Sequence, residues 1–308
     1  MISFVIPVYR SAESLPALYR RITGVFGDGE QDLEIIFVED CGGDDSWSVI
    51  RQLAATDRRV RGFRMSRNYG QHNALLCGIR EARGEVIVTM DDDLQHPPEE
   101  IPKLLDKLDE GYDVVYGSPE REQHGLLRDL ASQITKLALE GAMGAANARQ
   151  VSALRAFRTC LRDAFADYRN PTVNIDVLLT WATTNFSAVR VRHEERKSGQ
   201  SGYTPHKLVS HALNMMTGFS TRPLQFASLM GFTFALFGLV ILAYVLMRWL
   251  LQGSTVPGFA FLASIIAIFS GTQLMALGII GEYLARMHFR TMERPTYVVR
   301  QHTEVRGA

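Results

Sequence analysis

Two long stretches near the end of the chain contain no charged residue, and they limit what the chain can fold into. The first runs from Phe226 to Met247 and the second from Gly258 to Gly281. Each is longer than the roughly 20 apolar residues that cross the hydrocarbon core of a bilayer. The alternative interpretation is a pair of buried helices in a globular core, but core helices rarely stay free of charge over such a length. The pattern therefore predicts two membrane-spanning helices.

Basic residues flank the two apolar stretches on their outer sides. They are Lys207, Arg222, Arg286, Arg290 and Arg294. The link between the stretches, RWLLQGSTVPG, is short and holds a single Arg. Lys and Arg are enriched in loops that face the cytoplasm. We therefore expect a multi-pass protein of the cell inner (plasma) membrane, with the N-terminal domain and both chain termini in the cytoplasm.

The charge balance and the cysteines narrow the remaining possibilities. The 308 residues include 33 basic and 33 acidic side chains, and a net charge of zero gives no reason to expect a nucleic-acid partner. Cys41, Cys77 and Cys160 lie far apart and lack the spacing of metal ligands, so reduced thiols are expected. The chain starts directly with ISFVIPVY, without the basic segment of a signal peptide, so no signal peptide is expected.

Ahead of the apolar stretches, short apolar runs alternate with segments of helical spacing. Strands are expected at ISFVIPVY, LEIIFVED, VRGFRMS and GEVIVTM, with a helix after each of the first three. Ser11 or Ser14 is a plausible N-cap of the first helix. This alternation predicts an α/β domain with a parallel, doubly wound sheet. Ligands bind such sheets beyond the carboxyl ends of the strands.

The residues at these strand ends are therefore candidates for a ligand site. They are Pro7, Tyr9, Glu39, Asp40, Ser66, Arg67, Asn68, Asp91, Asp92 and Asp93. The last three stand out in VTMDDDLQHPPEEIP, because three adjacent carboxylates repel one another. Mg²⁺ or Mn²⁺ would offset that repulsion and could also bind a diphosphate. The alternative is a solvated acidic turn before the following helix, but the strand-end position favours the metal.

Several segments resemble a known family. IPVY, VEDCGGDDS, RNYGQHNALLCGI, DDDLQHPPEEIP and YDVVYGS resemble successive motifs of the family 2 glycosyltransferases of GT-A fold. LRAFR, ERKSGQSGY, FSTRPL and GEYLARMHFRTMERPTYVV resemble its membrane-anchored polyprenyl-phosphate glycosyltransferases, notably the undecaprenyl-phosphate aminoarabinose and polyprenyl-phosphate glucose transferases. The resemblance covers almost the whole chain. It implies a Rossmann-like, doubly wound and mostly parallel sheet, followed by an amphipathic interface helix and two C-terminal transmembrane helices.

The resemblance and the hydropathy divide the chain into four expected parts. These are a cytoplasmic glycosyltransferase domain at 1–204, an amphipathic juxtamembrane helix at 205–223, two transmembrane helices at 224–285 and a cytoplasmic tail at 286–308. The tail segment RPTYVVRQHT alternates like a strand, and a strand needs a sheet edge to pair with. Resembling family members form tetramers in which such a tail reaches a neighbouring protomer. We therefore expect a homotetramer.

The resemblance also implies a role for each matching site residue. The expected nucleotide-binding residues are Pro7, Tyr9, Asp40, Arg67 and Asp91. The expected metal ligands, for Mg²⁺ or Mn²⁺, are Asp93 and Gln95. The expected phosphate and acceptor contacts are Arg121, Arg128, Arg196, Lys197, Ser201 and Tyr203. Asp91, Asp93 and Arg196 are the expected catalytic residues, and Asp92 stands where the family usually has Ala.

One departure from the family bears on the chemistry. Many relatives have Gly-Asp-Phe-Arg-Leu where this chain reads SALRAF, so an acidic residue is replaced near Ser152 or Ala153. A sugar hydroxyl acceptor would need a general base, whereas a phosphate monoester is mostly dianionic at pH 7 and can attack without one. The implied function is inverting transfer of a sugar from a nucleotide sugar, with uracil as the expected base, to polyprenyl phosphate at the cytoplasmic leaflet. The product would serve cell-envelope glycan or lipid modification.

Two other functions fit parts of the sequence. A processive polysaccharide synthase would share the fold, but two spans are few for a polymer channel and no Gln-x-x-Arg-Trp motif occurs. A non-catalytic membrane scaffold would bind a nucleotide sugar without turnover, and the metal motif argues against it. So does ERKSGQSGY, a loop with two glycines and two serines that we expect to be mobile without ligand and to close over the diphosphate.

Overall fold

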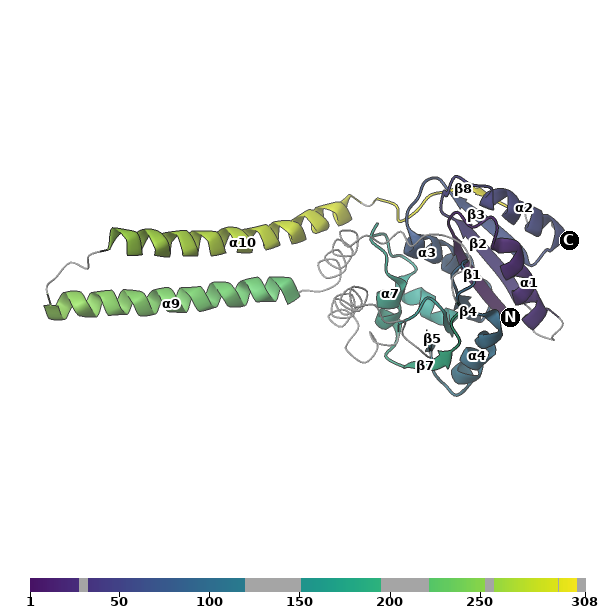
Figure 1. The fold of residues 1–308 in the computed structure, drawn as a ribbon, viewed down its shortest axis with the longest axis horizontal. Coiled ribbons are helices and arrows are strands. Elements are labelled where there is room, and N and C mark those ends of the chain that lie inside the picture. Colours follow the sequence, from purple (N-terminus) through teal and green to yellow (C-terminus); the bar gives the residue numbers. More distant parts are fainter. Residues whose placement is uncertain (28–32, 120–150, 195–221, 253–257, 293, 304–308) are drawn as a thin grey trace.

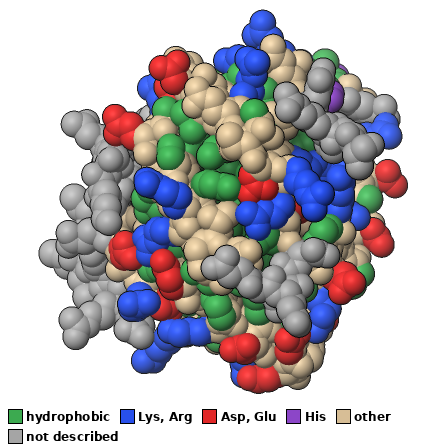
Figure 2. Space-filling model, turned by 90° about the vertical axis from the view of Figure 1, so that its right-hand side faces the viewer, with side chains coloured by type: hydrophobic (Ala, Val, Ile, Leu, Met, Phe, Trp, Pro, Cys, Tyr) green, Lys and Arg blue, Asp and Glu red, His purple; other side chains and the backbone are tan. Residues whose placement is uncertain are grey.

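The structure is a computed structural model in which an α/β domain carries two long projecting helices (Figure 1). It describes residues 1–27, 33–119, 151–194, 222–252, 258–292 and 294–303. On the face of the domain that points away from the long helices, basic and acidic side chains are interspersed (Figure 2). Such a mixed surface is typical of a domain that lies in water.

A mixed sheet forms the centre of the domain. Among the described residues it has eight strands in the order β7-β5-β6-β4-β1-β2-β3-β8. Their bounds are Ile2–Val8 (β1), Leu33–Glu39 (β2), Val60–Met65 (β3), Val86–Thr89 (β4), Val114–Pro119 (β5), Arg155–Arg158 (β6), Phe186–Val191 (β7) and Val299–His302 (β8). Strands β1 to β4 run parallel, as the sequence predicts, whereas β6 and β8 are antiparallel to their neighbours.

Helices cover both faces of this sheet, which confirms the doubly wound prediction. They are α1 (Leu15–Phe26), α2 (Ser46–Thr56), α3 (Gln71–Glu81), α4 (Ile101–Asp109) and α7 (Ile175–Ala182), with short 3₁₀ helices η1 (Pro98–Glu100) and η2 (Thr159–Phe165). Helices α1, α2 and α4 contribute to one core cluster, and α3, η2 and α7 to another. Strands β1 and β2 are buried along their whole length, because a parallel strand between two helical layers has apolar neighbours on both sides.

Two local features fix how the helices meet the sheet. Ser14 occupies the N-cap position of α1, but its hydroxyl donates to the Ser11 carbonyl instead of accepting a helix N–H. The predicted cap position is therefore confirmed without the predicted kind of bond. A Cβ on Gly78 would lie 2.4 Å from a methyl carbon of Val5, so only glycine allows α3 to approach β1 this closely.

The two long helices correspond to the predicted membrane spans. They are α9 (Arg222–Gln252) and α10 (Phe259–Thr291), and they lie side by side (Figure 1). Leu224–Arg248 and Ile268–His288 are long and apolar enough to cross a bilayer, and neither is buried. The rings of Phe234 and Phe269 meet edge to face at 5.8 Å. The two apolar helices make the chain a membrane protein. The predicted interface helix at 205–223 lies almost entirely outside the described residues.

The tail after α10 returns to the sheet as the strand β8. This strand pairs antiparallel with β3 of the same chain, with Phe63 opposite His302 and Arg64 opposite Gln301. The Ser66 N–H continues the pairing by donating to the carbonyl of Val298 at 2.9 Å. The strand itself is confirmed, but its own chain supplies the sheet edge that we expected a neighbouring protomer to supply. The homotetramer therefore stays a prediction from resemblance.

Candidate active site

The loops that follow β1 and β2 are tied together at the carboxyl end of the sheet. The Ser11 N–H donates to the hydroxyl of Ser46 at 3.0 Å, and the Ala12 N–H donates to Asp44 at 3.2 Å. The Arg10 guanidinium donates to the Gly42 carbonyl at 2.9 Å. These bonds hold the backbone of the loop after β1 against the loop after β2. The side chains of Tyr9 and Arg10 in the first of these loops are exposed.

Asp40, predicted as a nucleotide contact, is buried and holds the loop after β3. Its two carboxylate oxygens accept the backbone N–H groups of Tyr69 and Gly70, each at 2.7 Å. Burial raises the pKa of Asp40, and the two backbone hydrogen bonds only partly offset that effect. The visible role of Asp40 is therefore to position the Ser66–Gly70 loop, and a direct contact with the nucleotide stays a prediction.

Two arginine–tyrosine pairs lie in the loops that follow β1 and β3. The Arg67 guanidinium lies 4.6 Å from the ring centre of Tyr69, and that of Arg10 lies 5.3 Å from the ring centre of Tyr9. Tyr9 is 46% exposed, whereas Pro7 is buried inside β1 opposite Val38. The exposed ring of Tyr9 and the half-buried ring of Tyr69, each paired with a guanidinium group, suit a flat, anionic ligand such as a nucleotide.

Each of the three adjacent aspartates accepts a hydrogen bond from a different residue. Asp91 accepts the side-chain amide of Gln71, from the start of α3, at 2.5 Å. Asp92 accepts the Tyr9 N–H, from the end of β1, at 3.1 Å. Asp93 accepts the Gln95 N–H, within the same turn, at 3.1 Å. The three carboxylates are thus held by three different hydrogen-bond donors.

The pKa of Asp92 is raised above its ordinary value. Burial raises its pKa, hydrogen bonds from Ser11 and from the Tyr9 N–H partly offset this, and the neighbouring Asp93 raises it further. Asp92 therefore links the loop after β1 to the turn formed by Asp91 to Gln95, which we call the aspartate turn. The Ala that is usual at this position in the family could not make this contact. The sequence singled out Asp92 as a departure but did not indicate this partner.

The donor set of the aspartate turn fits a hard divalent cation. Asp91, Asp93 and Gln95 offer carboxylate and amide oxygens, the ligands that Mg²⁺ and Mn²⁺ prefer. In the part of the chain that the structure describes, no three His, Cys, Asp or Glu side chains already surround one point. Mg²⁺ is commonly held by one or two carboxylates together with substrate phosphates, so a cation shared with a diphosphate fits this turn.

A histidine next to the turn was missed by the sequence reasoning. His96 is 8% exposed, its Nε2 lies 3.4 Å from the Ser152 hydroxyl, and its ring meets the edge of His193 at 5.0 Å. Burial, with smaller contributions from His193 and Arg155, lowers the pKa of His96 to about 4. It is therefore neutral at pH 7. The stretch with Ser152 and Ala153, near which the resembling family carries an acid, thus places no carboxylate beside His96.

His72 lies in the first turn of α3 and is half-buried. Its Nδ1 accepts the Ile175 N–H at 3.3 Å and so supports the start of α7. Several predicted contacts lie outside the described residues, namely Arg121, Arg128, Arg196, Lys197, Ser201 and Tyr203. The last described residue before the final four of these is Glu194, whose N–H donates to the Gln95 carbonyl at 2.9 Å. The chain therefore leaves β7 beside the aspartate turn.

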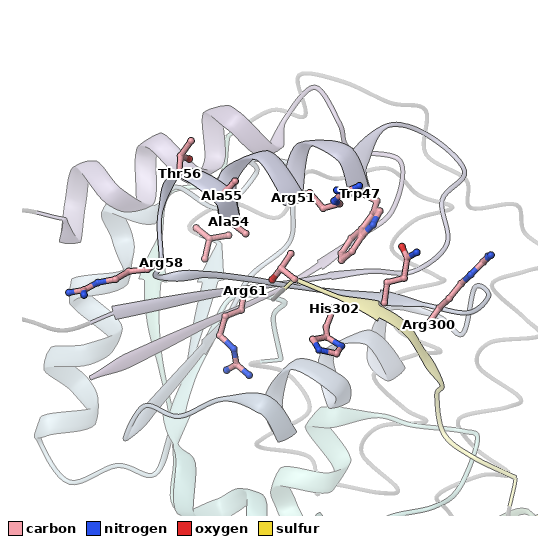
Figure 3. Close-up of a pocket in the computed structure, with 12 residues that line it drawn as sticks. Trp47, Arg51, Ala54, Ala55, Thr56, Arg58, Arg61, Arg300 and His302 are labelled. Atoms are coloured by element: carbon pink, nitrogen blue, oxygen red, sulfur yellow. The ribbon is translucent and has the colours of Figure 1, made fainter. Parts of the chain in front are cut away.

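A cavity of about 970 Å³ lies elsewhere, between α2, β3 and β8 (Figure 3). Trp47 and Arg51 border it from α2, and Arg300 and His302 border it from β8 (Figure 3). Its lining includes basic residues but no carboxylate. The cavity lies at the β8 edge of the sheet, whereas the candidate active site lies at the carboxyl ends of the strands, where parallel sheets bind ligands.

A doubly wound sheet with an aspartate turn at its strand ends, joined to two apolar helices, is the arrangement that the sequence resemblance leads us to expect. Residues 3–167 match the family model described as glycosyl transferase family 2. That match covers more than half of the chain, and the chain belongs to this family. The protein is therefore a glycosyltransferase enzyme.

Curated relatives match over nearly the whole chain. The undecaprenyl-phosphate 4-deoxy-4-formamido-L-arabinose transferase of Pseudomonas fluorescens (strain SBW25) is 35% identical over 97% of this chain and 88% of its own length. The protein of the same name from Pseudomonas aeruginosa (strain LESB58) is 34% identical over 97% of this chain and 89% of its own length.

Solved structures share the fold at low identity. Glucosyl-3-phosphoglycerate synthase from Mycobacterium tuberculosis, in complex with Mn²⁺, UDP and glucosyl-3-phosphoglycerate, superposes with a TM-score of 0.53 and 18% identity over 70% of this chain and 77% of that one. Its complex with phosphoglyceric acid gives a TM-score of 0.51 at 18% identity, over 70% of this chain and 78% of that one. These likenesses confirm the GT-A fold of the sheet domain.

Proposed function

We propose that this chain transfers a sugar from a nucleotide-sugar donor to polyprenyl phosphate at the membrane surface. The observation that carries the proposal is the union of an aspartate turn at the strand ends with two apolar helices in one chain. An acceptor that cannot leave the bilayer needs an enzyme held beside it. Relatives about 35% identical are named undecaprenyl-phosphate transferases of a modified arabinose, which supports this acceptor.

The donor half of the site is assigned to the loops after β1 to β4. Tyr9, Asp40, Arg67 and Asp91 would hold the nucleoside and its sugar, and uridine is the proposed nucleoside. Asp93 and Gln95 would hold Mg²⁺ or Mn²⁺, which when bound supplies positive charge to the departing diphosphate. The structural neighbour bound to Mn²⁺ and UDP supports this assignment.

The proposed reaction needs no general base. An electron pair on the acceptor phosphate oxygen forms the new bond to the anomeric carbon. The bond from that carbon to the diphosphate oxygen breaks, and its electrons leave with the nucleoside diphosphate. In-line attack inverts the anomeric centre. The phosphate has its second pKa near 6 and is mostly dianionic at pH 7. The missing family acid near Ser152 or Ala153 and the neutral His96 beside Ser152 are both compatible with such a nucleophile.

The proposed phosphate contacts come from two segments outside the described residues, 120–150 and 195–221. Arg196, Lys197, Ser201 and Tyr203 would contact the diphosphate, and Arg121 and Arg128 the acceptor phosphate. The bond between Glu194 and Gln95 supports the first assignment, because two residues span at most about 7 Å. The proposed location is the inner membrane, with the sheet domain on the cytoplasmic side, and the basic flanks of the two apolar helices support this orientation.

A donor panel tests the proposal. The full-length protein in nanodiscs is incubated with polyprenyl phosphate, Mg²⁺ or Mn²⁺, and single UDP- or GDP-linked sugars. The lipid product is then weighed by mass spectrometry. We expect one added sugar from a UDP donor, with inverted anomeric configuration by NMR. A ladder of additions would identify a processive synthase instead, and nucleotide binding without any lipid product would identify a scaffold.

A further inference from the structure

Three separate segments of the domain meet in a group of ion pairs next to the aspartate turn. Arg21, on α1, donates to both oxygens of Glu99 at 3.1 and 2.7 Å and to both oxygens of Glu194 at 3.3 and 2.9 Å. Glu99 lies on η1, directly after the aspartate turn, and Glu194 lies directly after β7. We call Arg21, Glu99 and Glu194 the carboxylate clamp. One guanidinium thus joins both segments to α1.

A second ion pair joins the same two segments. Glu100, whose side chain is 2% exposed, accepts the guanidinium of Arg192 at 2.7 Å and the ammonium of Lys103 at 2.5 Å. Burial alone would raise the pKa of Glu100, but the hydrogen bonds from Lys103 and Arg192 outweigh it and lower the pKa. Glu100 is therefore ionised at neutral pH and keeps the exit of β7 against η1.

The two ion pairs bracket a contact with the turn itself. Between Arg192 and Glu194 the chain places the His193 ring against His96, and the Glu194 N–H donates to the Gln95 carbonyl at 2.9 Å. The Gln95 N–H in turn donates to Asp93. A continuous path of bonds therefore runs from Arg21 through Glu194 and Gln95 to the Asp93 carboxylate.

We propose that Arg21 is a positioning residue for the metal, because the carboxylate clamp holds the Asp93–Gln95 turn in its metal-binding shape. In this proposal the clamp acts on the metal ligands through the backbone of Gln95. It fixes Glu194 against the Gln95 backbone, and that bond fixes the direction of the Asp93 and Gln95 side chains. Residues that orient metal ligands from outside typically change metal affinity by 10- to 100-fold. The inference rests on the proposed function, since it assumes that the turn binds a divalent cation.

The test measures Mn²⁺ affinity directly. Full-length Arg21→Gln protein in detergent is titrated with Mn²⁺ in the presence of saturating UDP, and free Mn²⁺ is followed by EPR. We expect the dissociation constant for Mn²⁺ to rise about tenfold. Hydrogen exchange at the Glu194 amide should become faster in the same variant, because its bond to Gln95 loses support. Arg21→Lys, which reaches one carboxylate but cannot fork to two, should recover part of the affinity.

Arg59→Gln is the matched control. Arg59 makes a forked ion pair with Asp57, its exposure is similar to that of Arg21, and it lies just before β3, at the opposite end of that strand from the crevice. This control should lower the melting temperature by about as much as Arg21→Gln but leave Mn²⁺ affinity within twofold. Unchanged Mn²⁺ affinity in Arg21→Gln, with a lowered melting temperature, would show a purely structural clamp. If the unmodified protein with UDP bound no Mn²⁺, the metal assignment itself would fail instead.

Discussion

Replacing Asp40 by Asn separates two roles that this carboxylate could have. In the structure both of its oxygens accept backbone N–H groups of the Ser66–Gly70 loop at 2.7 Å, and the side chain is buried. An amide keeps one acceptor and turns the other into a donor. One of the two loop N–H groups would then face an N–H₂ group and stay unsatisfied inside the protein.

The cost of this change follows from the lost bond. A hydrogen bond to a charged group contributes about 1.5–3 kcal/mol, and a buried donor left without a partner costs about 1–3 kcal/mol. These contributions overlap, and removing the desolvated charge that raises the pKa of Asp40 offsets part of them. We therefore expect a net loss of about 2–4 kcal/mol. For a domain of this size that lowers the melting temperature by roughly 5–15 °C.

Thermal unfolding of the full-length protein in detergent measures this change, and calorimetry with UDP measures the accompanying loss of nucleotide affinity. Asp45→Asn is the matched control, because Asp45 is exposed and its side chain makes no cap hydrogen bond to α2. A structural Asp40 predicts that melting temperature and affinity fall together. An unchanged melting temperature with a tenfold loss of UDP affinity would refute the reasoning and make Asp40 a direct ligand contact.

The remaining predictions concern the metal, the acceptor, the diphosphate and the core. Asp93→Asn should reduce transfer at least a hundredfold without unfolding, since an amide binds a hard cation weakly; full activity in excess chelator would contradict this. Ser152→Ala should keep most activity, with a rate that follows acceptor ionisation near pH 6; a hundredfold loss would indicate a missed role. Arg196→Ala should lower turnover more than UDP affinity, as steady-state kinetics with calorimetry would show. Asp176→Asn should destabilise the domain by about 3–5 kcal/mol in thermal unfolding, because it leaves the buried Arg155 without its carboxylate partner.

The parallel half of the sheet was predictable because its pattern is physically unambiguous. Continuous apolar runs such as Ile2–Val8 suit a strand buried on both faces, and helical spacing between them forces parallel crossovers. The antiparallel β6 and the pairing of β8 were not predictable in the same way. Val299–His302 alternates like any edge strand, and alternation does not say which edge, or which chain, it joins.

The crevice was predictable in place but not in its contacts. Strand ends of a parallel sheet must meet at one edge, so Tyr9, Asp40 and the aspartate turn were expected at the same edge of the sheet. Nothing in local sequence links Arg21 to Glu194, because such pairs depend on the tertiary path of the chain. The carboxylate clamp therefore became visible only in the structure.

The backbone conformation of the loops after β1, β2 and β4 could not be predicted from the sequence. Arg10, Cys41 and Leu94 have φ values of +58°, +54° and +62°, and they follow β1, β2 and β4 respectively. Glycine or asparagine usually marks such left-handed positions, so these three carry no recognisable signal. Each costs on the order of 1–3 kcal/mol and persists only where the surroundings fix it. Here the fixing contacts are the bond from Arg10 to the Gly42 carbonyl and the burial of Leu94. The strained backbone positions therefore lie in the loops that follow β1, β2 and β4, next to largely buried strands.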